Sequence, residues 1–132
     1  MVPRRGTSFL WRRVIDTRRL DREAHIVVDL TFGDAGKGTL TDFLARRHQA
    51  HTVIRFNGGA QAGHNVVTPD GRHHTFSQFG AATFIPGVRT HLSRFVVLNP
   101  LAMLVEAENL SAAGVSDAFA RTTISAEALV VS

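Results

Sequence analysis

The residues best suited to chemistry lie in two glycine-rich segments of this 132-residue chain. The first segment, residues 32–39, reads FGDAGKGT and contains the only lysine of the sequence, Lys37. The second, residues 57–64, reads NGGAQAGH. Glycine lets a backbone approach phosphate oxygens closely because it has no Cβ, and a lysine at a helix start adds positive charge to backbone N–H groups. This combination predicts a binding site for a phosphate group.

Two further titratable side chains accompany the lysine. Asp34 lies inside the first segment, where a carboxylate beside bound phosphates suits either Mg²⁺ binding or proton abstraction. His64 ends the second segment and suits a hydrogen bond to a phosphoryl oxygen or a proton transfer. The structural alternatives are a strained turn without ligand, a helix-capping aspartate and a structural histidine. One acid–base group in each of two glycine-rich loops favours the functional interpretation.

Apolar patterning predicts the elements that must position these loops. Residues 25–30 are apolar and rich in β-branched side chains, which predicts a buried strand before the first loop. Leucine and phenylalanine then recur at helical spacing, which predicts a helix to about residue 48. Residues 52–56 predict a second strand before the second loop. In a parallel sheet both loops would lie at the carboxyl edge, where ligands of open α/β folds bind.

The remainder of the chain continues this alternation. A hairpin turn at residues 69–71 is expected between strands at 65–67 and 74–79. A strand at residues 92–98 leads to a helix capped by Asn99, with Pro100 in its first position and apolar side chains at Leu101, Leu104, Val105 and Leu110. Gly114 is the expected stop, and short strands follow at 122–124 and 129–131. The sequence therefore predicts an α/β fold with a mostly parallel sheet and flanking helices.

Composition and charge exclude several classes of protein. Without cysteine there are no disulfides, thiolate metal sites or cysteine nucleophiles, and no apolar run approaches the roughly 18 residues of a membrane-spanning helix. Residues 1–22 hold seven arginines and two aspartates, so subtraction from 15 basic and 11 acidic side chains leaves 8 and 9 in residues 23–132. The positive net charge therefore belongs to a basic N-terminal extension, expected to be flexible. A nucleic-acid-binding module acting through this extension is an alternative, disfavoured because residues 23–132, the body of the chain, are close to neutral.

The two loops resemble those of a known family, the adenylosuccinate synthetases. That family has W-G-D-E-G-K-G-K after its first strand, and V-R-[FY] followed by G-G-x-N-A-G-H after its second. This chain has FGDAGKGT and VIRFNGGAQAGH, in the same order, and the resemblance extends over residues 25 to 131. The ordinary P-loop is excluded, because Thr31 and Gly38 stand where the Walker A motif needs glycine and Ser/Thr. The resemblance implies a P-loop-like, GTP-dependent synthetase fold, incomplete here, over residues 23–132.

The resemblance also implies an activity and roles for individual residues. GTP would phosphorylate the 6-oxygen of IMP with Mg²⁺, and L-aspartate would displace the phosphate to give adenylosuccinate. Asp34 would take the N1 proton of the purine and contact the metal, and His64 would stabilise charge between phosphate and purine. The other implied contacts are Lys37 on the transferring phosphates, the Gly63 carbonyl on the metal, Gln61 and Ala62 on the nucleotide, and backbone N–H groups of Gly33, Gly36 and Gly38. A cytoplasmic homodimer is implied for the full-length enzyme, without membrane or nucleic-acid partners.

Departures from the family pattern leave an alternative open. Ala35 replaces a glutamate, Ala60 a residue that is usually histidine, and Gln61 an asparagine, which favours a paralogue acting on another purine nucleotide or amine as the second interpretation. Family members are several times longer, and no N-K-x-D guanine motif occurs in this sequence. We therefore expect the chain to be the N-terminal piece of a longer enzyme, without ligase activity alone.

Overall fold

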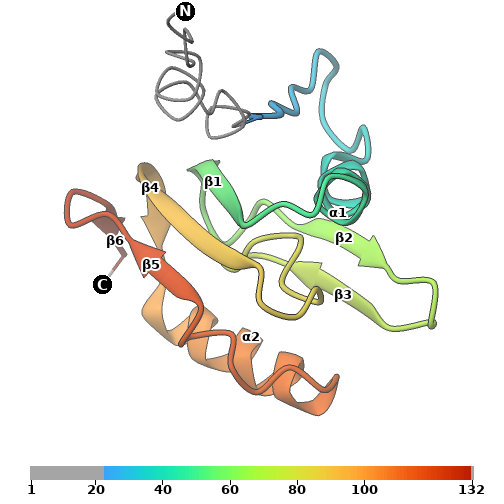
Figure 1. The fold of residues 1–132 in the computed structure, drawn as a ribbon. Helices are drawn as coiled ribbons and strands as arrows, with labels where there is room; N and C mark the ends of the chain where they lie inside the picture. The colour runs from blue at the N-terminus through green and yellow to red at the C-terminus, as the bar shows by residue number, and fades with distance from the viewer. Residues whose placement is uncertain (1–22, 132) are drawn as a thin grey trace, which may run out of the picture.

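The centre of the fold is a small sheet in which every strand pairing is parallel. The computed structural model describes residues 23–131, so the predicted basic extension lies outside the described residues. Strand β4 (Arg89–Leu98) pairs with β1 (Thr52–Gly58), with β5 (Thr122–Ile124) and, at its carboxyl end, with β6 (Leu129–Val130) (Figure 1). These strands confirm four of the expected ones and the parallel α/β class.

A separate hairpin carries the second predicted motif. Strands β2 (His64–Val67) and β3 (His73–Phe76) pair antiparallel, and the turn between them contains the predicted Pro-Asp-Gly sequence with Gly71 at φ 85°. Helix α1 (Lys37–Arg47) contacts β2 (Figure 1). The expectation that the second hairpin strand reaches residue 79 is wrong, because backbone N–H groups of residues 77–79 turn to the carboxylate of Glu106 instead of a strand partner.

Helix α2 (Pro100–Ala112) packs against the core on a different face from the one that Leu101, Leu104 and Val105 indicate. Asn99 caps the helix as predicted, its side-chain oxygen accepting from the Ala102 N–H at 3.0 Å. The buried side chains are those of Met103, Glu106 and Leu110, which recur at helical spacing. The other apolar side chains singled out from the sequence are exposed: Leu101, Leu104 and Val105.

The core lies between α2, the sheet and the segment that follows β3. Its largest fully buried apolar side chains are Phe76, Phe79, Phe84, Leu92 and Leu110. The rings of Phe76 and Phe84 meet edge to face, with centroids 5.5 Å apart, which is a favoured geometry for aromatic pairs. Neither helix in residues 23–131 is long and apolar enough to cross a membrane.

The strand predicted for residues 25–30 is absent from the structure, and this expectation was wrong. These residues form no helix or strand, and Ile26 and Leu30 are 85% and 90% exposed. They run apart from the sheet, on the side where α1 lies (Figure 1). A strand needs a partner for its backbone N–H and C=O groups, and the described strand pairings involve only β1 to β6, none of which pairs with residues 25–30. An apolar, β-branched pattern sets a preference for extended backbone but supplies no partner.

Two of the three leucines of α2 test which face of this helix is buried. We expect Leu110→Ala to lower the free energy of unfolding by about 2–5 kcal/mol, because it removes a fully buried side chain from the core. Leu101→Ala on the same helix is the matched control and should change it by less than about 0.5 kcal/mol, since Leu101 is 75% exposed. Urea unfolding followed by circular dichroism measures both, and equal losses would contradict this packing.

Candidate functional site

The two glycine-rich loops meet around one hollow of about 360 Å³. Six of the residues predicted from the sequence line it: Asp34, Gly36, Lys37, Gly38, Gly63 and His64. Three predicted residues, Gly33, Gln61 and Ala62, do not line it, and three others do: Ala35, Thr39 and Asn65. The structure therefore brings together the acid, the lysine and the histidine on which the sequence-based hypothesis depends.

The loops are joined by a close contact between α1 and β2, not by two neighbouring parallel strands as expected. A Cβ placed on Gly38 would lie 2.8 Å from the His64 Cβ and 2.9 Å from its carbonyl carbon. Beside this contact the Thr39 hydroxyl donates to the Asn65 carbonyl at 3.0 Å. Gly38 thus lets the first turn of the helix lie directly against the start of β2. Thr39 could not be recognised from the sequence, because its partner is 26 residues away.

The N-terminus of α1 is open toward an anion. Its N-cap, Gly36, has φ 76°, and no side chain caps the helix. No acidic residue occurs in the first turn. The backbone N–H groups at a helix start have no partners within the helix, and the helix dipole adds partial positive charge there. Since Lys37, Gly38 and Thr39 all line the hollow, this end of it suits a phosphate group.

Asp34 supplies an acid in an unusual backbone conformation. Its φ is 54°, in the left-handed region that residues other than glycine rarely adopt, and Gly33 before it has φ 112°. Such conformations cost about 1–3 kcal/mol and often occur at ligand sites. Asp34 and Gly63 both line the hollow, so a carboxylate and a backbone carbonyl are available there. Oxygen donors of these two kinds, completed by substrate phosphates, fit Mg²⁺.

Lys37 has a partner that the sequence analysis missed. Its ammonium group lies 2.6 Å from the Asp29 carboxylate, and the hydrogen bond from Lys37, with others from Thr31, holds the pKa of Asp29 far below its ordinary value. Asp29 belongs to the segment wrongly predicted as a strand, which hid its role. A phosphate group that binds Lys37 must therefore compete with this carboxylate. The only signal available in the sequence was an acidic residue, Asp29, before the lysine, and it did not show that the two side chains pair.

The electrostatic surroundings of His64 favour its neutral form. Burial lowers the pKa of His64 below its ordinary 6.5, and the positive charges of Arg55 and Lys37 lower it further. The neutral imidazole can accept a proton or donate one N–H hydrogen bond. An anion bound in the hollow would act in the opposite direction on the pKa of His64, since it would stabilise the imidazolium.

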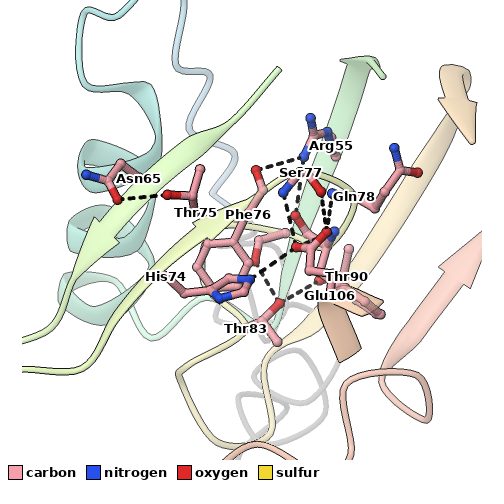
Figure 2. Close-up of polar contacts among 12 residues, drawn as sticks. Arg55, Asn65, His74, Thr75, Phe76, Ser77, Gln78, Thr83, Thr90 and Glu106 are labelled. Atoms are coloured by element: carbon pink, nitrogen blue, oxygen red, sulfur yellow. Dashed lines mark hydrogen bonds and ion pairs between the residues drawn. The ribbon is translucent and has the colours of Figure 1, made fainter. Parts of the chain in front are cut away.

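Arg55 holds the second loop from beneath, and sequence reasoning recognised it only as part of a motif. Its guanidinium donates to the carbonyls of Ala62 at 2.8 Å and Gly59 at 3.4 Å. It also donates to the carbonyl of Phe79 and to that of Phe76, as Figure 2 shows for Phe76. The side chain is buried, and burial lowers the pKa of Arg55 while Glu106 raises it. Because arginine stays protonated in proteins, the loop rests on a permanent buried charge.

One cluster of possible metal ligands lies away from the hollow. Within residues 23–131, the ligand atoms of Glu23, His25 and His48 lie within 4.8 Å of one another, and all three residues are exposed. The two imidazole rings partly stack, with centroids 4.1 Å apart and planes inclined by 37°. The His25 Nε2 and the His48 Nδ1 both contact the same carboxylate oxygen of Glu23, at 3.3 Å and 3.5 Å. The cluster is a pair of exposed histidines that share one carboxylate.

The sequence of the chain is similar to those of adenylosuccinate synthetases. The family model described as adenylosuccinate synthetase matches residues 26–132. The adenylosuccinate synthetase of Mycobacterium leprae is 37% identical over 92 residues, which cover 70% of this chain and 21% of that protein. The Saccharopolyspora erythraea enzyme is 35% identical over 108 residues, covering 82% and 24%. The chain thus spans less than a quarter of the length of these curated relatives.

Solved structures show the same fold. A fully ligated adenylosuccinate synthetase from Plasmodium falciparum aligns with TM-score 0.63 and 24% identity, covering 75% of this chain and 22% of that one. The succinoaminodeoxyadenylate synthetase of cyanophage S-2L, bound to dGMP and dATP, aligns with TM-score 0.61 and 22% identity, covering 80% and 28%. The prediction of a synthetase-type α/β fold, of which this chain holds part, is confirmed.

A variant of Gly38 tests the contact that joins the loops. We expect Gly38→Ala to lower the free energy of unfolding by about 1–3 kcal/mol and to move the backbone NMR signals of residues 63–65, because its Cβ meets His64. Gly114→Ala is the control: Gly114 has φ 89° and open space around it, so this variant should lose stability without moving those signals. Unchanged signals in Gly38→Ala would contradict the contact.

The protonation of His64 can be followed by NMR through its imidazole signals. We expect a pKa below 6.5 in the free chain, rising when inorganic triphosphate is added. Without triphosphate, the unfolded chain binds more protons at His64 than the folded chain does between the lowered pKa and 6.5. The free energy of unfolding therefore falls as the pH drops through that interval, and His64 does not reduce it above pH 6.5. A pKa at or above 6.5 without ligand would show that His64 does not have these surroundings.

Proposed function

Because the chain belongs to the adenylosuccinate synthetase family, we propose that it forms the phosphate-handling part of a GTP-dependent ligase that joins IMP and L-aspartate. The observation that carries this proposal is the convergence of Asp34, Lys37 and His64 on one hollow at the uncapped start of α1. An acid, a cation and a neutral imidazole around open N–H groups are what phosphoryl transfer to a purine oxygen requires. The two roles needed beyond binding are proton removal and charge stabilisation.

The proposed chemistry assigns one task to each side chain. Asp34 accepts the N1 proton of IMP, so that the 6-oxygen becomes the nucleophile toward the γ-phosphorus of GTP. Lys37 and the N–H groups of the first turn of α1 hold the phosphate oxygens, and His64 donates a hydrogen bond to the oxygen on which charge develops. Mg²⁺, held by the Asp34 carboxylate and the Gly63 carbonyl, would neutralise charge on the phosphates. The amino group of aspartate then displaces the phosphate from C6.

The ion pair between Lys37 and Asp29 adds an exchange step to binding. The Asp29 carboxylate lies 2.6 Å from the Lys37 ammonium group. When phosphate oxygens arrive, Lys37 changes partner and Asp29 is left to solvent. Because water can reach this partly exposed pair, the exchange costs little compared with the contacts that a triphosphate gains. Asp29 therefore keeps the lysine in place without blocking the site.

A second candidate function is ligation on a purine nucleotide other than IMP. It is favoured by the replacements Ala35, Ala60 and Gln61 and by the likeness to a synthetase described with dGMP and dATP. Ala35 lines the hollow, so the loss of a glutamate there changes which groups the site can hydrogen-bond. Competition between IMP and other purine monophosphates, measured on the full-length enzyme, separates the two candidates. Homodimerisation and a cytoplasmic location belong to the same proposal.

Binding of inorganic triphosphate with Mg²⁺ tests the proposed function on the chain itself. We expect measurable binding by calorimetry and a loss of about tenfold or more in Lys37→Met, because a charge-assisted hydrogen bond contributes about 1.5–3 kcal/mol. Arg94→Met is the control, since Arg94 is exposed on β4 and pairs with Glu127 outside the hollow.

Three outcomes would contradict parts of this proposal. Equal affinity of Lys37→Met and the unmodified chain would remove Lys37 from the site. A loss of the same size in Arg94→Met would show that binding depends only on net charge. Formation of adenylosuccinate by the isolated chain from IMP, GTP, Mg²⁺ and aspartate would contradict our expectation that the remaining part of the enzyme is required.

A further inference from the structure

A buried glutamate on α2 collects the backbone N–H groups that follow β3. The Glu106 carboxylate accepts from the N–H groups of Gln78 at 2.6 Å, Ser77 at 3.1 Å and Phe79 at 3.3 Å, and from the Ser77 hydroxyl at 2.7 Å (Figure 2). Glu106 is only 4% exposed. Burial acts to raise its pKa, but the His74 ring, whose Nε2 lies 3.5 Å from Oε1, and the hydrogen bonds from Ser77, Gln78 and Phe79 hold the pKa below the ordinary value. The carboxylate is thus a fixed negative charge among donors.

Arg55 binds the carbonyl groups of the same segment from another side. Its guanidinium reaches the carbonyls of Phe76 at 3.5 Å and Phe79 at 3.4 Å, so residues 76–79 lie between two buried charges of opposite sign (Figure 2). Arg55 is 5% exposed. Its second terminal nitrogen extends to the other loop, where it reaches the carbonyls of Gly59 and Ala62. A single arginine therefore ties residues 76–79 to residues 59–62.

These contacts form a continuous path from α2 to the candidate site. The path runs from Glu106 through residues 77–79 to Arg55, and from Arg55 to the tight turn in which the Ala62 N–H donates to the Gly59 carbonyl at 3.0 Å. Gly63 and His64 follow that turn directly and line the hollow. The carbonyls that Arg55 binds would otherwise be buried polar groups in need of another donor. Movement of the turn away from its position leaves the arginine charge without these acceptors.

We propose that Glu106 and Arg55 are positioning residues that fix Gly63 and His64 relative to the start of α1. This inference rests on the proposed function for its consequence in phosphate binding, while the placement itself is a property of the free chain. Neither side chain lines the hollow that contains His64, so both act through the backbone. Displacing this turn would take hydrogen-bond partners from the buried Arg55 and disturb the segment that Glu106 holds. The loop is therefore held in place before a ligand binds.

The test compares two pairs of variants by NMR without ligand. Glu106→Gln keeps the size of the side chain but loses charge and part of its acceptor capacity, and Glu108→Gln, exposed on the same helix, is the matched control. Arg55→Lys keeps the charge but loses the planar fork that reaches several carbonyls, and Arg94→Lys is its control. We expect amide exchange of residues 59–64 to accelerate roughly tenfold in the two test variants only.

A variant that only loses stability is a further control. Leu110→Ala, which removes a core side chain one turn along α2 from Glu106, should lower the unfolding midpoint while the exchange of residues 59–64 stays that of the unmodified chain. If Glu106→Gln or Arg55→Lys fails to fold, the unmodified chain still decides: the amides of residues 59–64 and 77–79 should open together, with similar exchange rates. Exchange of the first group far faster than the second would overturn the proposal.

Triphosphate binding adds the functional consequence. We expect affinity to fall roughly tenfold in Glu106→Gln and Arg55→Lys and to stay unchanged in Glu108→Gln and Arg94→Lys. Absence of binding by the unmodified chain would overturn the proposed function but leave the ligand-free comparison standing. Normal exchange of residues 59–64 in folded test variants would overturn the positioning role, even if the unmodified chain binds triphosphate.

Discussion

The candidate site depends on the close approach of α1 to β2, which is possible because residue 38 has no side chain. The Cα of Gly38 lies so near His64 that a Cβ would fall 2.8 Å from the histidine's own. Without this contact the lysine at the start of the helix and the histidine at the start of the strand would belong to separate surfaces. With it, a helix N-terminus, a cation and an imidazole face the same hollow. Like a phosphate loop, this arrangement combines the backbone N–H groups of a helix start with a lysine, but its amino-acid sequence differs from the Walker A motif.

Two cations near the hollow are balanced by carboxylates, and the balance differs in kind. Lys37 meets Asp29 in a partly exposed ion pair, which water and a competing anion can replace. Arg55 is buried and donates to backbone carbonyls, and the negative charge of Glu106 raises its pKa. Both side chains hold residues 76–79. Breaking the second arrangement strands a buried charge, whereas breaking the first exposes two charges to solvent. One cation is therefore available to a ligand, and the other belongs to the scaffold.

Membership of the adenylosuccinate synthetase family gives this arrangement a context without completing it. The described residues contain the two glycine-rich loops and the supports of one of them, yet they correspond to less than a quarter of the curated relatives' length. Large apolar side chains of the sheet remain exposed, among them Ile54, Phe56 and Phe95. The rings of Phe56 and Phe95 pack on each other across β1 and β4, with centroids 5.0 Å apart, which removes part of that surface from water.

The sequence by itself determined the α/β class, the hairpin turn, the capped helix at Asn99 and the identity of six residues around the hollow. Each of these depends on local chemistry: a proline and glycine in a turn, an asparagine before a helix, glycines around a lone lysine. Only the tertiary structure decided that residues 25–30 form no strand, that Asp29 pairs with Lys37, and that Glu106 and Arg55 support the second loop. The physical reason is the same in each case. A strand, an ion pair and a buried carboxylate are completed by partners elsewhere in the chain, and residue type reveals a need for such a partner but not its position.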